Sequence, residues 1–482
     1  MTRRNADLAV LLAIAFTARV AAFMTQTYVV FRDETFQYFE QGHRLAFGSG
    51  VVPWEYRDGI RSMLLPAAIA GIMRLTSLIG DDPLLYVRIV RGLCSALSLV
   101  VVVVGYRMAE RYGRWAALLT GGLCAIWFDL IYFAPSVMTE VIAAHCGLLA
   151  LWLNQQGRAR WAGALLGLAL CLRFQYGPAL AAAVLWQVRL DWARWRALAI
   201  GGVPVVLAIG GVLDWVSWGA PFQSIWLNVL RNTFQGVSAA MGRESGLFYP
   251  AYLWVAFWPL PVLALAVIVG ARSFPALAIA AGVTLILHTA IPHKEVRFVY
   301  LALAAGPILI GLGLARAIEA WPNLRRIAPI GASVALLLLS WRLATVAPLD
   351  ARWSFERANV QAFLAAHDQP GLCGLGVKDI AIFDTGGYTY LHREVPIYFQ
   401  DFDPALELPG SSIRLRLAVR LGGQDVSQFP GAALDAVGGL YNYLIAEQGN
   451  AGASYAPLAC FTDQTRGEAA PLCLHRRPGG CS

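Results

Sequence analysis

The chain has 482 residues, of which 58% are hydrophobic and only 14% are charged, whereas a soluble domain usually carries roughly a quarter of charged residues. Its mean hydropathy is +0.56, and its recurring apolar segments approach the length that crosses a bilayer, which excludes an ordinary soluble enzyme and predicts a polytopic helical membrane protein. The net charge of +8 comes from arginines scattered between these segments, a pattern that fits the positive-inside rule and excludes a nucleic-acid-binding surface.

The first apolar segment, residues 7–24, follows Arg3 and Arg4 and contains no small-residue cleavage site. We therefore interpret it as a retained span and not as a removed signal. With a cytoplasmic N-terminus, residues 25–83 form one long outer loop. Within this loop, residues 62–79 are apolar but are interrupted by a proline, a glycine and an arginine, so they are either a second span or an interfacial hairpin.

The later arginines distinguish these two topologies. If residues 62–79 do not cross, every loop that holds these arginines lies in the cytoplasm, as the positive-inside rule requires; if they cross, all of these loops move outside. The non-crossing arrangement is therefore preferred. The arginines are Arg107, Arg111, Arg114, Arg158, Arg160, Arg189, Arg194, Arg196, Arg272, Arg316, Arg325 and Arg326. The eleven predicted spans are residues 7–24, 84–106, 115–134, 137–154, 161–175, 177–190, 197–218, 251–270, 275–292, 298–318 and 327–347.

From about Leu349 the apolar runs shorten and glycine, proline and aspartate become more frequent. The alternation in "YTYLHREVPIYF" predicts short strands and turns. The chain is thus expected to contain a transmembrane domain, residues 1–347, and a small α/β extracytoplasmic domain, residues 348–482. An even number of cysteines in an oxidising compartment predicts one or two disulfides, with three possible pairings. These cysteines are Cys373, Cys460, Cys473 and Cys481.

Several charged residues are not explained by topology. Asp33 and Glu34 follow the first span, and "HKEVRF" forms the turn between the ninth and tenth spans, so both lie at the outer face. Ionisable groups at a membrane edge indicate a functional site. A sugar transferase needs a carboxylate that takes a proton from the acceptor hydroxyl, and cations that hold a lipid phosphate. The candidate cations are Arg57, Arg61, His293, Lys294 and Arg297.

These charges also have structural interpretations. Asp33 and Glu34 could start an interfacial helix, because carboxylates stabilise a first helical turn. Lys294 and Arg297 could be anchors that extend toward the interface.

Four blocks in order resemble one known family: residues 32–62, 218–250, 293–298 and 386–399. Together they are similar to glycosyltransferase family 22, the membrane mannosyltransferases that use dolichyl-phosphate mannose in N-glycan and GPI-anchor assembly. The resemblance implies a GT-C fold and an inverting transfer from a polyprenyl-phosphate sugar, without a required metal or other cofactor. In one departure, Val296 stands where the family has a second glutamate.

The resemblance assigns roles to individual positions. Asp33 matches the acid of the family's first loop and is expected to be the general base, with Glu34 as the alternative. His293, Lys294 and Arg297 match the family's later turn and would contact the lipid phosphate, whereas Arg57 and Arg61 are expected to contact it because of their charge. The expected substrate-binding residues are Trp54, Glu55, Tyr56, Glu140, Arg173 and Asn228.

The predicted function is transfer of mannose, or a related hexose, from a polyprenyl-phosphate donor to a hydroxyl of a glycan or glycolipid acceptor at the outer face. The composition, rich in alanine and arginine, indicates a bacterial inner membrane with the active site facing the periplasm; a eukaryotic chain would lie in the ER membrane. One alternative is a transporter or lipid-linked sugar flippase, which should place ionisable residues near the bilayer midplane in paired repeats. Another is a non-catalytic assembly subunit. The acceptor, the linkage and the oligomeric state are not specified by the sequence.

Overall fold

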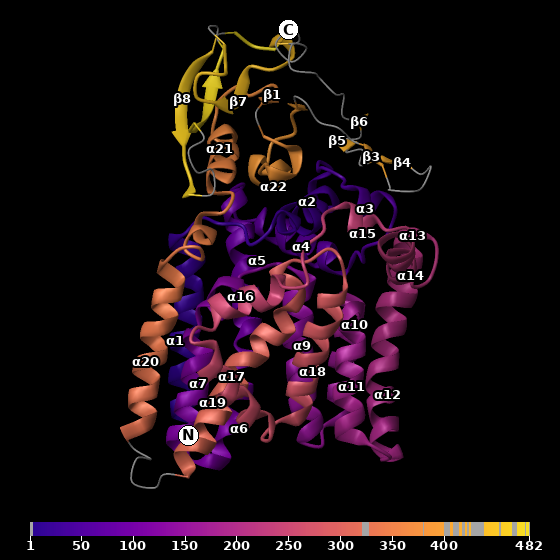
Figure 1. Cartoon of the computed structure of the whole chain (residues 1–482). Coiled ribbons are helices and arrows are strands. Elements are labelled where there is room, and N and C mark those ends of the chain that lie inside the picture. Colours follow the sequence, from indigo (N-terminus) through magenta and orange to yellow (C-terminus); the bar gives the residue numbers. More distant parts are fainter. Residues whose placement is uncertain are drawn as a thin grey trace. The chain divides into compact units, whose positions relative to one another are not determined.

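The computed structural model describes residues 3–320, 327–378, 380–399, 405–407, 414–416, 420–421, 424–425, 438–452, 455–464, 470–477 and 479–481. The chain forms two compact units (Figure 1). The first, here called the helical unit, comprises Met1–Ala22 and Arg91–Asp350; the second, the mixed unit, comprises Phe23–Val90 and Ala351–Ser482. The predicted domain boundary after residue 347 stays a prediction, and residues 23–90 group with the C-terminal segment.

Long apolar helices dominate the helical unit, because a helix satisfies its own backbone hydrogen bonds where no water is available. Among the described residues, five helices are long and apolar enough to cross a membrane, or six if one pair bent by 96° counts as a single span. The five are α1 (Arg3–Thr25), α5 (Pro83–Ser98) with α6 (Val100–Ala109), α12 (Trp192–Val206) with α13 (Asp214–Trp218), α19 (Tyr300–Glu319) and α20 (Ile327–Thr345). The bent pair is α16 (Phe248–Ala256) and α17 (Leu260–Ala271).

The remaining helices of this unit are shorter. Each of the eleven predicted spans overlaps one or two helices, whereas length and composition alone qualify only five or six. The shorter helices are α7 (Arg114–Ile126), α8 (Phe128–Phe133), α9 (Thr139–Gln155), α10 (Ala159–Leu172), α11 (Gly177–Val188), α14 (Gln223–Val229), α15 (Val237–Ala240) and α18 (Pro275–Ala290).

Two helix pairs approach closely through glycines. A Cβ atom on Gly163 or Gly201 would overlap backbone atoms across the α10–α12 interface, and one on Gly270 or Gly313 would do so between α17 and α19. Small residues allow this approach in membranes, where packing and not the hydrophobic effect holds helices together. Helices α10 and α12 accordingly run side by side (Figure 1).

Gly201→Ala is therefore expected to lower the apparent melting temperature, since overpacking a close interface costs about 1–3 kcal/mol. Gly282, also in a helix of this unit, is the matched control, because a Cβ there meets nothing within 4 Å. Gly282→Ala should leave stability unchanged or raise it slightly, as alanine is the better helix former. Thermal unfolding of both variants in detergent, followed by tryptophan fluorescence, checks this; equal melting temperatures would contradict it.

Arg19 shows how a buried cation is accommodated in this unit. Its side chain is 0% exposed and donates to Ser98 Oγ at 2.9 Å and to the carbonyls of Ala15, Cys124 and Ala125 at 3.0, 3.1 and 2.9 Å. Such bonds offset the cost of removing a charge from water. Arg19 thereby ties α1 to α5 and to α7.

The mixed unit begins with the long loop after α1. Its helical part consists of a π-helical segment Glu34–Phe39, α2 (Glu40–Phe47), α3 (Trp54–Arg57) and α4 (Leu64–Thr76). Helix α4 has 13 residues, so it extends about 20 Å and is too short for a hydrocarbon core of about 30 Å. Helices α10 and α11, which overlap predicted spans, have only 14 and 12 residues, so length does not decide the case and the non-crossing arrangement of residues 62–79 stays a prediction.

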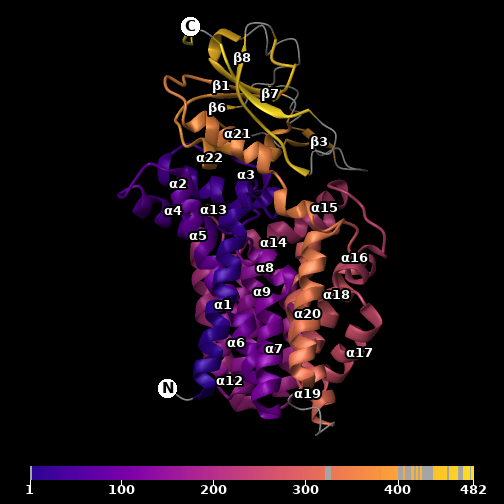
Figure 2. The ribbon, with the colours of Figure 1, turned by 90° about the vertical axis from the view of Figure 1, so that its left-hand side faces the viewer.

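The C-terminal part of this unit contains a five-stranded sheet in the order β2-β1-β7-β9-β8. Strands β2, β1 and β7 are parallel, and β7, β9 and β8 are antiparallel. Helix α21 (Arg357–His367) packs against β8 and β9 (Figure 2). The strands are β1 (Leu375–Val377), β2 (Ile397–Phe399), β7 (Tyr443–Glu447), β8 (Ala456–Phe461) and β9 (Leu472–Arg476), with two short pairs, β3 (Ala405–Glu407) with β4 (Arg414–Arg416) and β5 (Arg420–Leu421) with β6 (Gln424–Asp425).

Two disulfides stabilise this part. Cys460 pairs with Cys473 across β8 and β9, and Cys373 pairs with Cys481, which gives one of the three pairings that the sequence allows.

The predicted strand alternation in "YTYLHREVPIYF" is wrong for its first half. Residues Gly387–Leu391 form the short helix α22, and the strand is confined to Ile397–Phe399. The reason lies far away in sequence: the carboxylate of Glu40 accepts hydrogen bonds from the backbone N–H groups of Tyr388 and Thr389 at the start of this helix. Local alternation carries no information on such a partner.

Candidate active site

Asp33 lies at the start of the helical run in the mixed unit. It has helical backbone angles and precedes the π-helical segment Glu34–Phe39. The Asp33 side chain is half-buried, whereas Glu34 is 1% exposed and its Oε2 accepts from the N–H of Val30 at 3.0 Å. Glu34 therefore holds its own loop together, and Asp33 is the more accessible carboxylate of the pair.

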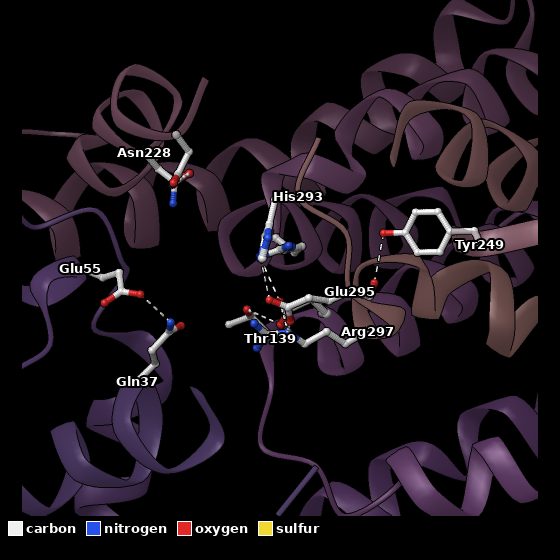
Figure 3. A network of polar contacts seen from close by, with 11 residues as sticks. Gln37, Glu55, Thr139, Asn228, Tyr249, His293, Glu295 and Arg297 are labelled. Carbon is white, nitrogen blue, oxygen red and sulfur yellow. Dashed lines mark hydrogen bonds and ion pairs between the residues drawn. The ribbon is translucent and has the colours of Figure 1, made fainter. Parts of the chain in front are cut away.

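The remaining predicted residues of the first loop lie in or after α3. Gln37 Nε2 donates to Glu55 Oε1 at 2.8 Å, which joins the π-helical segment to α3 (Figure 3). Trp54 and Tyr56 are 5% and 3% exposed, so neither offers an open aromatic face for a sugar in this structure. Arg57 is exposed and Arg61 is half-buried; their contacts with the donor phosphate stay predictions.

The segment that precedes Asp33 is held by the C-terminal segment of the same unit. Arg32 Nε lies 2.7 Å from Asp384 Oδ1 and 3.8 Å from Glu356 Oε1. The N–H of Val29 donates to the carbonyl of Phe355 at 3.1 Å. The residues on the N-terminal side of Asp33 are thus fixed by a charged group and by a backbone hydrogen bond.

Glu356 titrates near neutral pH in this cluster. Burial raises the pKa of the Glu356 carboxyl to about 7, aided by the charge of Asp384 and opposed by a hydrogen bond from Asn359 and by the charge of Arg32. Burial likewise raises the pKa of Asp384. Near pH 7 the two carboxyls therefore carry fewer than two negative charges between them.

The contribution of the Glu356 carboxyl to stability should accordingly fall as the pH rises from about 4.5 to about 7. The pKa of this carboxyl is about 7 in the folded state, against 4.5 for the unperturbed group. Between these two pH values the folded protein keeps the proton and the unfolded chain loses it. The contribution of the group to stability is therefore present at low pH and is lost as the pH rises toward 7. We expect Glu356→Gln to flatten this part of the melting temperature's pH dependence. The exposed Glu394→Gln is the control, and an unchanged slope in Glu356→Gln would contradict the assignment.

The second group of predicted residues forms an ion-pair network in the helical unit. Arg173 follows the last residue of α10, and Glu140 lies in the first turn of α9. The Nη1 atom of Arg173 lies 3.1 Å from Glu140 Oε1, and Arg297 Nε lies 3.9 Å from the same oxygen. Both arginines are buried, at 6% and 5% exposure, and both guanidinium carbons lie over the ring of Phe298, at 4.9 and 5.2 Å from its centroid.

Glu295 connects this network to His293. Its Oε1 lies 2.8 Å from His293 Nε2, and its Oε2 pairs with Arg297 (Figure 3). Burial alone would raise the pKa of Glu295, but the charge of Arg297 and hydrogen bonds from His293 and Arg297 outweigh it, so the pKa lies below its ordinary value. Tyr249 Oη also donates to the Glu295 carbonyl at 3.1 Å. The sequence analysis assigned no role to Glu295, although His293 and Arg297 each stand two residues from it in the chain.

Lys294 and Asn228 are engaged in local structure. Lys294 is 6% exposed, and its ammonium donates to the carbonyls of Ile291, Glu244 and Pro292 at 2.6, 3.1 and 3.4 Å. Because an ammonium has three donors, Lys294 stabilises the turn after α18. Asn228 is buried in α14, and its Oδ1 accepts from Asn232.

The structure thus brings Glu140, Arg173, Arg297 and His293 together in the helical unit, and it places Asp33, Glu34 and the α3 residues in the mixed unit. The first unit offers two buried guanidiniums of the kind that bind phosphate oxygens. The second offers a half-buried carboxylate that could accept a proton. Within the described residues, no group of three histidine, cysteine or acidic side chains is arranged to hold a metal ion; whether the reaction requires a metal stays a prediction.

Comparison with a solved structure identifies the fold. ArnT from Cupriavidus metallidurans, bound to undecaprenyl phosphate, matches with a TM-score of 0.61 over 97% of both chains at 16% sequence identity. This likeness assigns the chain the GT-C fold. The model of the Alg9-like mannosyltransferase family matches residues 9–362, and the chain belongs to this family.

Curated relatives agree with the family. GPI mannosyltransferase 3 of Yarrowia lipolytica is 28% identical over 432 residues, which cover 82% of this chain and 77% of the relative. GPI mannosyltransferase 3 of Drosophila melanogaster is 26% identical over 444 residues, which cover 83% and 72%. The predicted resemblance and the predicted class of enzyme, a membrane mannosyltransferase, are both confirmed. The transporter or flippase alternative receives no support from these relatives.

Proposed function

We propose that the enzyme transfers mannose, with inversion, from a polyprenyl-phosphate donor to a hydroxyl of a glycan or glycolipid acceptor at the outer face of the membrane. The observation that carries the proposal is the buried pair of guanidiniums, Arg173 and Arg297, beside His293. The undecaprenyl phosphate bound to ArnT supports a lipid-phosphate donor, and the GPI mannosyltransferase relatives support a glycolipid acceptor.

In the proposed reaction, the hydroxyl oxygen of the acceptor attacks the anomeric carbon of mannose. At the same time Asp33 accepts the proton of that hydroxyl. The bond from that carbon to the phosphate oxygen breaks, and the lipid phosphate leaves with the electron pair. Arg297 and Arg173 offset the negative charge that develops on the leaving group, the role that fixed cations have in such transfers. His293 contacts Glu295 Oε1 and Lys294 holds the backbone of the same turn, while Glu295 and Glu140 orient the guanidiniums.

Purified full-length protein in lipid nanodiscs tests this function. With radiolabelled polyprenyl-phosphate mannose and a glycolipid extract as acceptor, we expect labelled glycolipid with the anomeric configuration inverted, and the same rate in EDTA because no metal is expected to take part. Transfer from a nucleotide-activated mannose alone, or retention of configuration, would overturn the proposal.

We further propose the eleven-span topology, with the first loop and the C-terminal segment outside the cytoplasm, in a bacterial inner membrane or, for a eukaryotic chain, in the ER. Single cysteines test this topology by their reaction with a membrane-impermeant maleimide. They are introduced as Arg243→Cys and Gln156→Cys, at exposed residues in loops that are predicted to lie on opposite sides of the membrane. The four free native cysteines are buried, which keeps the background low. We expect labelling of position 243 only from outside and of position 156 only after permeabilisation; the reverse pattern would invert the topology.

A further inference from the structure

Glu40 makes an unusual set of contacts within the mixed unit. Its side chain is 0% exposed. Oε1 accepts from the N–H groups of Val51 and Tyr388 at 2.8 and 2.9 Å, and Oε2 accepts from the N–H and the hydroxyl of Thr389 at 2.9 and 2.7 Å. All four groups donate to the carboxylate, so both oxygens are fully engaged and neither is open to a substrate.

The backbone of α22 is shaped to receive this carboxylate. Gly387 has φ +56°, and a Cβ atom there would lie 2.7 Å from Glu40 Oε2. Any larger residue would therefore be strained and would also displace the carboxylate. Gly387, the first residue of α22, thus leaves room for the Glu40 carboxylate. The contact between Glu40 and Thr389 joins α2 to α22, although these two residues are 349 positions apart in the chain.

A second contact lies one helical turn further along α2. His43 is 1% exposed; its Nδ1 lies 2.7 Å from the Ser49 carbonyl, and its Nε2 lies 2.8 Å from Nδ1 of His392. Residues three apart on a helix share a face, so Glu40 and His43 present one side of α2 to residues 387–392.

Asp33 begins the same continuous helical run. It precedes the π-helical segment Glu34–Phe39, which passes without interruption into α2 at Glu40. A shift of α2 along or about its axis is therefore transmitted to the Asp33 carboxylate, while the preceding residues are held separately through Arg32 and Val29.

We propose that Glu40 is a positioning residue, which acts through residues 387–389 to hold the helix that presents Asp33, and that it does not itself react. This inference rests on the proposed function, in which Asp33 is the base. A displacement of a catalytic group by about 1 Å can lower a rate by about 100-fold, so the expected signature is a loss in kcat without a matching loss in donor binding.

Two variants with graded effects test this proposal in the full-length protein. Glu40→Gln replaces one accepting oxygen by an NH2 group that faces donors, and kcat for mannosyl transfer should fall by about 100-fold. Thr389→Val removes one of the four bonds, and kcat should fall by about tenfold. The donor KM should stay within about twofold in both. Because the two residues contact each other, the double variant should be no slower than Glu40→Gln alone.

Thr389→Ser, which keeps the hydroxyl, should restore the rate, and Glu394→Gln at an exposed position is the matched carboxylate control. Wild-type turnover in Thr389→Val, or multiplicative losses in the double variant, would mean that Glu40 acts independently of residues 387–389 and would overturn the proposal.

Hydrogen exchange of residues 33–47 provides a readout that does not depend on the reaction. Exchange should increase in both Glu40→Gln and Thr389→Val relative to the wild type, and unchanged exchange would overturn the positioning role. If the wild type fails to use polyprenyl-phosphate mannose, the proposed function fails, and the exchange result still decides whether Glu40 holds this helix.

Discussion

Asp33→Asn is expected to lower kcat for mannosyl transfer by about 10²–10⁴-fold, the range associated with removal of a general base. Asparagine has nearly the same shape as aspartate, so the start of the helical run should persist, but its amide cannot accept a proton from the acceptor hydroxyl. Donor affinity, measured by titration with a fluorescent polyprenyl phosphate, should change by less than about threefold, because the proposed base does not contact the phosphate.

The neighbouring Glu34 provides the matched control. Its Oε2 accepts from the N–H of Val30 and its side chain is 1% exposed. A glutamine at this position retains a carbonyl oxygen that can accept the same bond, so Glu34→Gln should lower kcat by no more than about tenfold, the effect of weakening one hydrogen bond to a charged group. Near-normal turnover in Asp33→Asn together with a severe loss in Glu34→Gln would exchange the two roles.

Much of this arrangement could be predicted from local sequence. Long apolar runs determine where the helices lie, whereas the non-crossing arrangement of residues 62–79 stays a prediction that rests on the arginines. The carboxylate pair after α1 and the basic turn before α19 were visible because ionisable residues stand out against an apolar background. These features depend on residues close together in the chain, which is the information that composition and periodicity contain.

Some features were missed because the partner is distant in the chain, and others because side-chain contacts between near neighbours are not visible in a sequence. The alternation of residues 387–391 predicted a strand, but Glu40 supplies acceptors that favour a helical turn there. The role of Lys294 as a phosphate ligand stays a prediction, and in this structure its ammonium donates to three backbone carbonyls. Glu295 had no assigned role, although it joins His293 to Arg297. For residues 387–391 the partner could not be seen in the sequence, whereas the partners of Glu295 stand two residues away and only the structure shows that the side chains meet.

Arg297 carries the second large expected effect. Its guanidinium pairs with Glu295 and lies 3.9 Å from Glu140 Oε1, in a site where it is 5% exposed. Arg297→Gln removes one of the two guanidiniums proposed to hold the donor phosphate, so we expect the donor KM to rise by about 100-fold, since a charged hydrogen bond of about 1.5–3 kcal/mol is lost. Kinetics at varied donor and saturating acceptor concentrations measure this change.

Two further substitutions separate phosphate binding from loss of structure. Arg297→Gln leaves Glu140 and Glu295 with fewer cationic partners, and removing one member of a buried pair destabilises a protein strongly, so a fall in melting temperature alone would not be informative. Arg297→Lys keeps the charge but not the planar fork that matches phosphate oxygens. It should restore most of the melting temperature, while the donor KM remains at least about tenfold above the wild-type value.

Lys294→Met should show the opposite result. Its melting temperature should be lower, because three carbonyls lose their donor, and its donor KM should lie within about threefold of the wild type. If Lys294→Met raised the donor KM as much as Arg297→Lys, the ammonium would have to leave its carbonyls when donor binds, and the turn itself, more than the guanidinium pair, would be the phosphate site.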